Sequence, residues 1–152
     1  MIKTLTKKEC IEILSENYIG HLGYIFQNRP FVIPITYYFN SKDNMIICYS
    51  GEGHKTIAMR RNDEVALQVN EIDTVNRWKS VLIHGKFQQL FGSDAKAQLH
   101  SFSLGIKDII LNREFRDVDF ISEFSSKIAA YEDQVIFKIN VEEITGKKRL
   151  RF

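Results

Sequence analysis

Apolar residues recur at helical spacing at the start of the chain and then alternate with polar residues, as they do in strands. Residues 6–17 carry one apolar stripe of the helical kind. The sequence Thr6-Lys7-Lys8-Glu9 is a capping box, in which the Thr6 hydroxyl accepts from the Glu9 N–H and the Glu9 carboxylate accepts from the Thr6 N–H. We therefore predict an amphipathic helix over residues 6–17.

Three strands joined by polar turns are predicted next. They cover residues 19–26, 31–39 and 45–50, and the turns between them are rich in asparagine and other turn-forming residues. Pro34 lies in the middle of the second strand and has no N–H to donate to a sheet. It therefore indicates an edge strand, or a place where a ladder hydrogen bond is missing.

The second half of the chain alternates helices and longer strands. The predicted elements are a helix at 54–62, strands at 65–70 and 77–91, a helix at 94–111 and a last strand at 131–144 that ends before a basic tail. Gly85 marks a bend or bulge in the longest strand, and residues 112–130 have no clear pattern. Six strands with helices at early, middle and late positions predict one mainly β domain over residues 1–152, an antiparallel β-barrel with appended helices.

Composition narrows the function classes. Of the 152 residues, 44% are hydrophobic and 26% are charged, which is the balance of a globular protein with a core. The net charge of +2 is too small to indicate a polyanionic partner, so we expect no nucleic acid. The short basic run from Lys147 to Arg151 and the aromatic strands keep a nucleic-acid hypothesis open.

Other classes are excluded by what the sequence lacks. No charge-free stretch approaches the roughly 20 apolar residues of a membrane span. Two cysteines are too few for a disulfide scaffold and fit the reducing cytoplasm. The four histidines show no metal-ligand spacing, so no metal site is predicted. Aromatic residues make up 12% of the chain, which favours strands and a hydrophobic pocket.

The segment 48–56 is the first candidate for chemistry. It runs from a strand through two glycines into the first turn of a helix that carries Lys55. Unpaired N–H groups at a helix start, flexible glycines and a cation form an anion site suited to a phosphate, and Ser50 and Thr56 add hydroxyl donors. The lysine does not directly follow a glycine, so the segment is not a P-loop. An ordinary strand-to-helix turn with a solvated lysine is the alternative.

The second candidate is a strand face. Period-two geometry places Trp78, Ser80, Leu82 and His84 on one face of the strand at 77–91. Such a face suits a cavity for a flat polar heterocycle, with Trp78 as a wall and Ser80 as a hydrogen-bonding group. The alternative is that Trp78 anchors the core and that His84 faces solvent.

An ordered set of short motifs resembles the pyridoxamine 5′-phosphate oxidase-related flavoproteins, and most of all the branch similar to the 5-nitroimidazole-resistance (Nim) proteins. The motifs are Ile19-Gly20-His21-Leu22-Gly23, Arg29-Pro30-Phe31-Val32-Ile33-Pro34, Gly53-His54-Lys55, Arg61-Asn62 ahead of Val65, and Trp78-Lys79-Ser80-Val81 with Gly85. The resemblance covers roughly residues 5–91, with these motifs in order, and the ending at 139–147 also fits.

This resemblance implies a split β-barrel of the FMN-binding type, and a homodimer that holds FMN in clefts between its subunits and acts on a small-molecule substrate. The residues that it assigns to the cofactor are Gly53, His54 and Lys55 at the phosphate, Tyr49 and Ser50 along the ribityl and phosphate path, the backbone of Ile33, Pro34, Ile35 and Thr36 at the isoalloxazine edge, Ser80 as a polar flavin contact and Trp78 at the mouth of the cleft. Tyr37 is a further aromatic candidate. No catalytic side chain is predicted.

Two positions depart from the family pattern. Arginine is common in the family where this chain has His54, so the phosphate would be held more by Lys55 and the helix N-terminus. Nim-like relatives often carry a histidine where this chain has Cys48, so the resemblance supports FMN binding more than nitroimidazole reduction. Cys48 itself is expected to be a small buried apolar residue.

The leading hypothesis is therefore an FMN-dependent oxidoreductase in which the flavin carries the redox chemistry. The alternative is a non-catalytic flavin- or haem-binding module on the same barrel. In that case His21, His84 and His100 are the candidate haem ligands.

Overall fold

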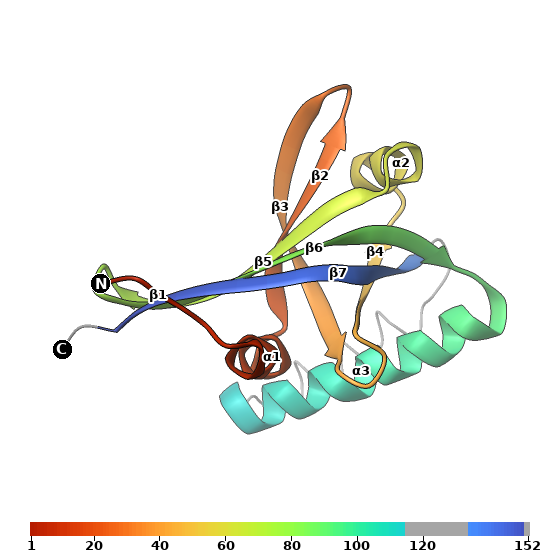
Figure 1. The fold of residues 1–152 in the computed structure, drawn as a ribbon. Coiled ribbons are helices and arrows are strands. Elements are labelled where there is room, and N and C mark those ends of the chain that lie inside the picture. The colour runs from red at the N-terminus through yellow and green to blue at the C-terminus, as the bar shows by residue number, and fades with distance from the viewer. Residues whose placement is uncertain (115–133, 151–152) are drawn as a thin grey trace.

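The structure, a computed structural model, describes residues 1–114 and 134–150, and Figure 1 shows its seven strands and three helices. In chain order these elements are β1 (Lys3–Thr4), α1 (Lys7–Glu16), β2 (Ile19–Phe26), β3 (Arg29–Asn40), β4 (Met45–Gly51), α2 (His54–Arg61), β5 (Glu64–Thr74), β6 (Arg77–Leu90), α3 (Gly92–Glu114) and β7 (Gln134–Leu150). Of these three helices, none is both long and apolar enough to cross a bilayer.

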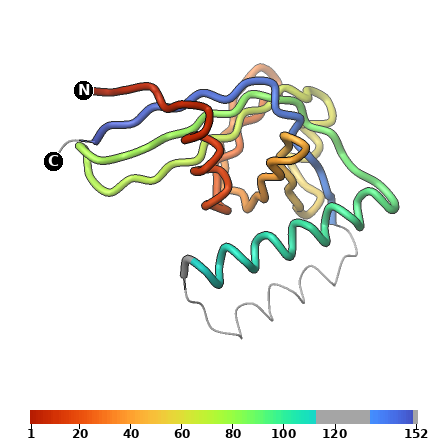
Figure 2. Tube along the Cα trace, turned by 60° about the horizontal axis from the view of Figure 1, so that its bottom comes forward, coloured from red at the N-terminus to blue at the C-terminus, as the bar shows by residue number. Residues whose placement is uncertain are grey.

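The strands form one antiparallel sheet that closes on itself. Its order is β1-β7-β4-β3-β2-β5-β6, and a further pairing of β6 with β7 joins the two sides of the sheet into a barrel. The hairpin of β2 and β3 projects from the barrel beside α2, and α3 lies along the opposite side (Figures 1 and 2). The predicted antiparallel barrel with appended helices is confirmed.

Two hydrophobic clusters hold this arrangement. The alternating inward positions of the strands fill the barrel, and Leu22, Leu67, Ile83 and Phe137 are among the fully buried residues there. The second cluster lies between the outer face of β4 and α3, where Phe102 is fully buried. The helix α3 therefore covers a sheet face that would otherwise expose large apolar side chains.

The capping box of α1 is present as predicted. The Glu9 N–H donates to the Thr6 Oγ1 at 3.2 Å, and the Thr6 N–H donates to the Glu9 Oε1 at 3.0 Å. Lys148 on β7 also donates to the Glu9 Oε2 at 2.8 Å. The hydrogen bond from Lys148, together with that from the Thr6 backbone, lowers the pKa of the Glu9 carboxyl to about 2. The same carboxylate thus caps α1 and ties it to the sheet.

The predicted end of the last strand is wrong. Instead of stopping at Ile144, β7 continues to Leu150, so the basic residues before Arg151 belong to the sheet and not to a tail. A glycine fits at position 146 because the segment from Leu5 to Cys10 approaches closely: a Cβ there would be 2.7 Å from the Cys10 Sγ and 2.7 Å from the Leu5 Cδ1. The short strand β1, which pairs with β7, was also not predicted.

The remaining boundaries agree within a few residues. The helix predicted at 94–111 extends over Gly92–Glu114, and β5 continues to Thr74. The expected start of the last strand at 131, and residues 115–130 of the unassigned segment, lie outside the described residues. The predicted bulge at Gly85 is confirmed, since the register of β6 against β7 shifts between His84 and Gly85.

Gly85 gives a test of the barrel closure. A Cβ at this position would lie 2.8 Å from the Ile139 Cγ2 and against the Asn140 carbonyl oxygen. Because the clash is with backbone of the neighbouring strand, Gly85→Ala should lower the free energy of unfolding by about 1–3 kcal/mol. Urea denaturation measures the change. Gly51→Ala is the matched control, since its Cβ would meet nothing within 4 Å; an equal loss in both variants would contradict the prediction.

Candidate functional site

The ladder between β3 and β4 ends early and leaves a split in the barrel. The two strands pair from Asn40–Met45 as far as Tyr37–Cys48, whereas residues 29–36 of β3 pair with β2. Within the described residues, the segment Ile33–Thr36 therefore has a strand on one side only. Pro34 lies in this segment, so the missing ladder hydrogen bond predicted from proline is confirmed.

The end of β4 faces this free edge of β3. If the β3–β4 ladder continued in register, Tyr49 would lie opposite Thr36 and Ser50 opposite Ile35. Instead β4 turns after Gly51 into α2 (Figure 1). The free backbone edge of Ile33–Thr36 and the turn that leads into α2 therefore both follow the end of the β3–β4 ladder.

The turn between β4 and α2 is held by its own hydroxyl groups. The Ser50 Oγ donates to the Gly51 carbonyl at 2.9 Å. The Thr56 Oγ1 accepts from the Gly53 N–H at 3.0 Å and donates to the Gly53 carbonyl at 2.9 Å. Both hydroxyl groups thus donate within the turn in this structure, and their predicted role as donors to an anion stays a prediction.

The backbone at Gly51 and Gly53 and the N-terminus of α2 are accessible to a ligand at this turn. A Cβ added at Gly51 or at Gly53 would meet nothing within 4 Å, so a ligand could approach the backbone closely. The first N–H groups of α2, at His54 and Lys55, have no carbonyl partner within the helix. They are suited to an anion because the N-terminal end of a helix is electropositive.

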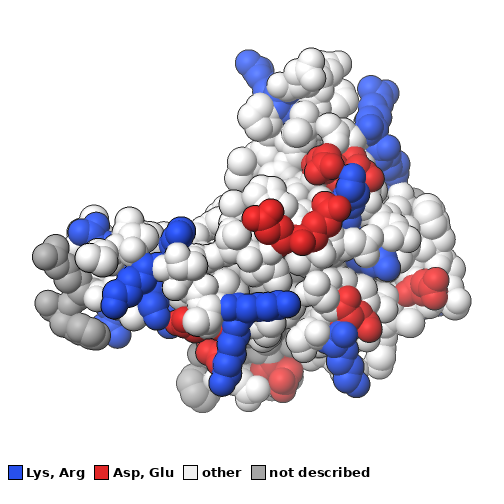
Figure 3. All heavy atoms as spheres, in the orientation of Figure 1, with Lys and Arg blue, Asp and Glu red and all other residues white. Residues whose placement is uncertain are grey.

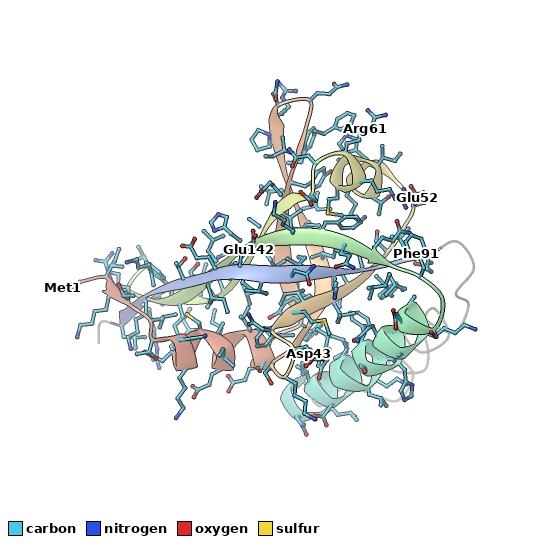
Figure 4. The ribbon with its side chains drawn as sticks, turned by 45° about the vertical axis from the view of Figure 1, so that its right-hand side comes forward. Met1, Asp43, Glu52, Arg61, Phe91 and Glu142 are labelled. Atoms are coloured by element: carbon cyan, nitrogen blue, oxygen red, sulfur yellow. The ribbon has the colours of Figure 1, made fainter. Side chains whose placement is uncertain are left out.

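The charges around the turn favour an anion at Lys55. The Lys55 side chain is half-buried and forms no ion pair within the described part of the chain. The acidic residue of the turn, Glu52, is neutralised by Arg60, whose Nη2 donates to the Glu52 Oε2 at 2.7 Å. This hydrogen bond lowers the pKa of the Glu52 carboxyl. Figure 4 shows Glu52 beside α2.

His54 is packed among aromatic rings of the β2–β3 hairpin. Its ring centroid lies 4.9 Å from that of Phe26 and 4.8 Å from that of Phe31, and the Tyr24 hydroxyl lies 2.9 Å from the His54 Nδ1. One ring nitrogen is thus occupied, and Nε2 has no hydrogen bond within the described residues. Sequence reasoning missed Tyr24, although the two-residue turn after Phe26 places it directly opposite Phe31.

Three other residues of β3 and β4 are constrained by packing. The Tyr49 ring lies edge-on to Phe102 of α3, with centroids 5.1 Å apart, and burial raises its pKa. Tyr37 is fully buried and donates its hydroxyl proton to the Leu14 carbonyl at 2.9 Å, so it is not a ligand contact. Cys48 is fully buried as predicted, and burial raises the pKa of its thiol.

Trp78 and Ser80 lie on the outer face of the barrel. The predicted face of β6 is confirmed, since Val81 and Ile83 are buried on the other side. Trp78 is half-buried on this outer face and does not anchor the core. Ser80 accepts a hydrogen bond of 2.9 Å from the Gln68 Nε2.

These two residues are far from α2 within one chain. Trp78 lies opposite Ile72 and Ser80 opposite Asn70, whereas β5 begins at Glu64, just after α2. At about 3.3 Å per residue, Ser80 is roughly 20 Å and Trp78 roughly 26 Å along the sheet from the end of α2. Figure 1 likewise shows the β5–β6 turn on the opposite side of the molecule from α2. The structure therefore does not bring the two predicted halves of the site together in one copy.

The remaining chemical candidates are dispersed. Within the described residues, no group of three histidine, cysteine or acidic side chains is arranged to hold a metal ion. His21 and His84 lie on the outer sheet face and His100 on α3. On the face shown in Figure 3, basic and acidic side chains are interspersed, in keeping with the net charge of +2. Lys148, part of the basic run, is paired with Glu9.

A closed antiparallel sheet that parts between β3 and β4 defines the class of the protein as a split β-barrel. The family model described as pyridoxamine 5′-phosphate oxidase matches residues 6–148. The chain belongs to this family.

Individual relatives cover nearly the whole chain. An uncharacterised protein of Rhizobium meliloti is 24% identical over 148 residues, which are 96% of this chain and 94% of that protein. The crystal structure of an FAD-binding protein from Mesorhizobium loti is similar with a TM-score of 0.74 and 25% identity, covering 97% of this chain and 98% of that one. A candidate 5-nitroimidazole antibiotic resistance protein from Bacteroides thetaiotaomicron has a TM-score of 0.68 and 21% identity, covering 97% of this chain and 89% of that one.

Proposed function

We propose that this protein binds FMN and acts as an FMN-dependent oxidoreductase on a small organic substrate. The observation that carries the proposal is the turn between β4 and α2, which combines open glycine backbone, a helix N-terminus and Lys55 without a described counter-ion. Membership of the pyridoxamine 5′-phosphate oxidase family and the likeness to an FAD-binding protein support a flavin as the ligand. When bound, the flavin would supply the redox chemistry.

The residues of the turn fit the terminal phosphate of FMN. The Lys55 ammonium and the backbone N–H groups at the start of α2 would donate to the phosphate oxygens. Gly51 and Gly53 leave room for the phosphate, since nothing lies within 4 Å of a Cβ built at either residue. The Glu52 carboxylate would otherwise repel the phosphate, and Arg60 neutralises it.

The free edge of β3 fits the polar edge of the flavin ring. Backbone N–H and C=O groups of Ile33–Thr36 have no strand on their second side within the described residues. A flat heterocycle with its own donors and acceptors would satisfy these groups as a neighbouring strand does.

We also propose a cytoplasmic location, which is supported by the fact that both cysteines are free thiols.

Substitution of Lys55 tests the phosphate site. Lys55→Ala should weaken FMN binding about tenfold or more, because a charge-assisted hydrogen bond contributes roughly 1.5–3 kcal/mol. Titration of the apoprotein with FMN, followed by the quenching of flavin fluorescence, measures the affinity. Riboflavin, which lacks the phosphate, should bind equally to both proteins, and Lys42→Ala in the exposed turn after β3 is the control. Equal FMN affinity of wild type and Lys55→Ala would remove the assignment.

Turnover separates an oxidoreductase from a binding module. With FMN bound, NADH or NADPH should bleach the flavin absorbance under anaerobic conditions, and an added organic acceptor should restore it. The measurement is the visible spectrum over time. A protein that binds FMN tightly but is neither reduced nor reoxidised with any donor and acceptor pair would be a non-catalytic flavin-binding module.

A homodimer would complete the site, and we propose one with FMN in clefts between the subunits. Trp78 and Ser80 lie roughly 20–26 Å along the sheet from α2, so they can belong to the same flavin site as Lys55 only if a second copy supplies them. The outer sheet face is also apolar in part, with Val32 69% and Ile72 65% exposed. Exposed apolar side chains of this kind favour a protein partner.

Mixed dimers test the shared cleft. In a dimer of one Lys55→Ala subunit and one Trp78→Ala subunit, one cleft carries both substitutions and the other carries neither. Each variant alone should bind FMN weakly, while the mixture should regain wild-type affinity for part of its sites. Titration of the variants separately and after subunit exchange measures the recovery. Affinity in the mixture that is only the average of the two variants, or a monomer in analytical ultracentrifugation, would rule out the shared cleft.

A further inference from the structure

His54 has a defined orientation in this structure. Its Nδ1 lies 2.9 Å from the Tyr24 hydroxyl, and its ring meets Phe26 and Phe31 at interplanar angles of 75° and 61°. Tyr24 is in turn fixed, because it is only 5% exposed and stacks on Phe31 with centroids 5.4 Å apart. These three aromatic side chains contact the imidazole ring on the side of the hairpin, while the rest of His54 is exposed.

The chemistry of the pair decides where the imidazole proton lies. A phenol hydroxyl is a good hydrogen-bond donor, and the unprotonated nitrogen of a neutral imidazole is a good acceptor. With the Tyr24 hydroxyl as the donor to Nδ1, the ring proton of His54 would lie on Nε2. Nε2 has no hydrogen bond within the described part of the chain, so this N–H is free to donate.

We propose that Tyr24 is a positioning residue for the cofactor phosphate. It holds His54 in the tautomer that carries its proton on Nε2, and this neutral N–H donates to the phosphate beside Lys55. The inference rests on the proposed FMN function, because the phosphate is that of the bound cofactor. This hydrogen bond from His54 would make the protein bind a flavin that ends in a phosphate more tightly than a flavin without one.

The neighbouring charges suit a neutral donor at this position. Lys55 follows His54 in the chain, and the Arg61 guanidinium lies 5.8 Å from the centre of the Phe26 ring, against which His54 packs. With these cations in place, the imidazole contributes a directed hydrogen bond and does not need to contribute a charge. Within the described residues, the Tyr24 hydroxyl is the only group that forms a hydrogen bond with the ring.

The tautomer can be measured in the apoprotein, independently of flavin binding. Chemical shifts of ¹⁵N at the two His54 ring nitrogens should show the proton on Nε2 in the wild type. In Tyr24→Phe, which keeps the ring and removes the hydroxyl, these shifts should move toward a mixture of both tautomers. A proton on Nδ1 in the wild type would overturn the inference.

The ratio of FMN affinity to riboflavin affinity tests the role in binding. Tyr24→Phe should lower this ratio about three- to tenfold, the value expected for one hydrogen bond. In His54→Gln, the amide N–H₂ reaches the Nε2 position, so the ratio should stay close to the wild-type value. In His54→Asn, the shorter side chain does not reach that position, so the ratio should fall. Tyr38→Phe on β3, beside Gly105 of α3, is the matched control and should leave the ratio unchanged.

The outcomes distinguish this inference from the proposed function. If the wild type binds no FMN, the proposed function itself is wrong, and the inference falls with it. If the wild type binds FMN but Tyr24→Phe keeps both the ¹⁵N shifts and the affinity ratio, only the role of Tyr24 is overturned. An equal loss of the ratio in His54→Gln and His54→Asn would also overturn it, because a structural role alone predicts no difference between them.

Discussion

The ladder between β3 and β4 ends at the Tyr37–Cys48 pair, and the proposed site depends on this end. Past that pair, Pro34 has no N–H to offer a second neighbour, and β4 departs toward α2. In a fully paired sheet, the backbone N–H and C=O groups of Ile33–Thr36 would form hydrogen bonds with β4 and could not bind a ligand. The split therefore provides a set of directed polar groups on an otherwise closed barrel.

The turn that follows the split is held by short-range hydrogen bonds. The Thr56 hydroxyl bonds both backbone groups of Gly53, and the Glu52 carboxylate is held by Arg60. Arg60 also donates from Nε to the Gln89 side chain at 2.8 Å, which ties the turn to β6. A site whose groups are already in place loses little conformational entropy when the ligand binds.

Local signals in the sequence predicted the local parts of the fold. The capping box at Thr6, the bulge at Gly85 and the unpaired edge at Pro34 each depend on residues close in sequence or on one intrinsic property. The extension of β7 past Gly146 could not be predicted in this way, because residues 147–150 pair with the start of β6 and with β1, which are distant in sequence.

The same distinction holds for the candidate site. Gly53, His54 and Lys55 are consecutive, so the motif alone placed them at a helix start. The pairing of His54 with Tyr24 depends on how α2 packs against β2, thirty residues earlier in the chain. The separation of Lys55 from Trp78 depends on the length of β5, which exceeded the alternating segment visible in the sequence.

Barrel closure has a consequence for the order of folding. The strands β2, β3 and β4 and the helix α2 are consecutive, so the split and its turn involve only short loops. The barrel closes through β6 and β7, between which α3 and the segment to Gln134 intervene. Because long loops cost more entropy to close, the pairing of β6 with β7 should form late and limit the folding rate. The meander that carries the proposed phosphate site can therefore form early, before the rest of the barrel encloses it.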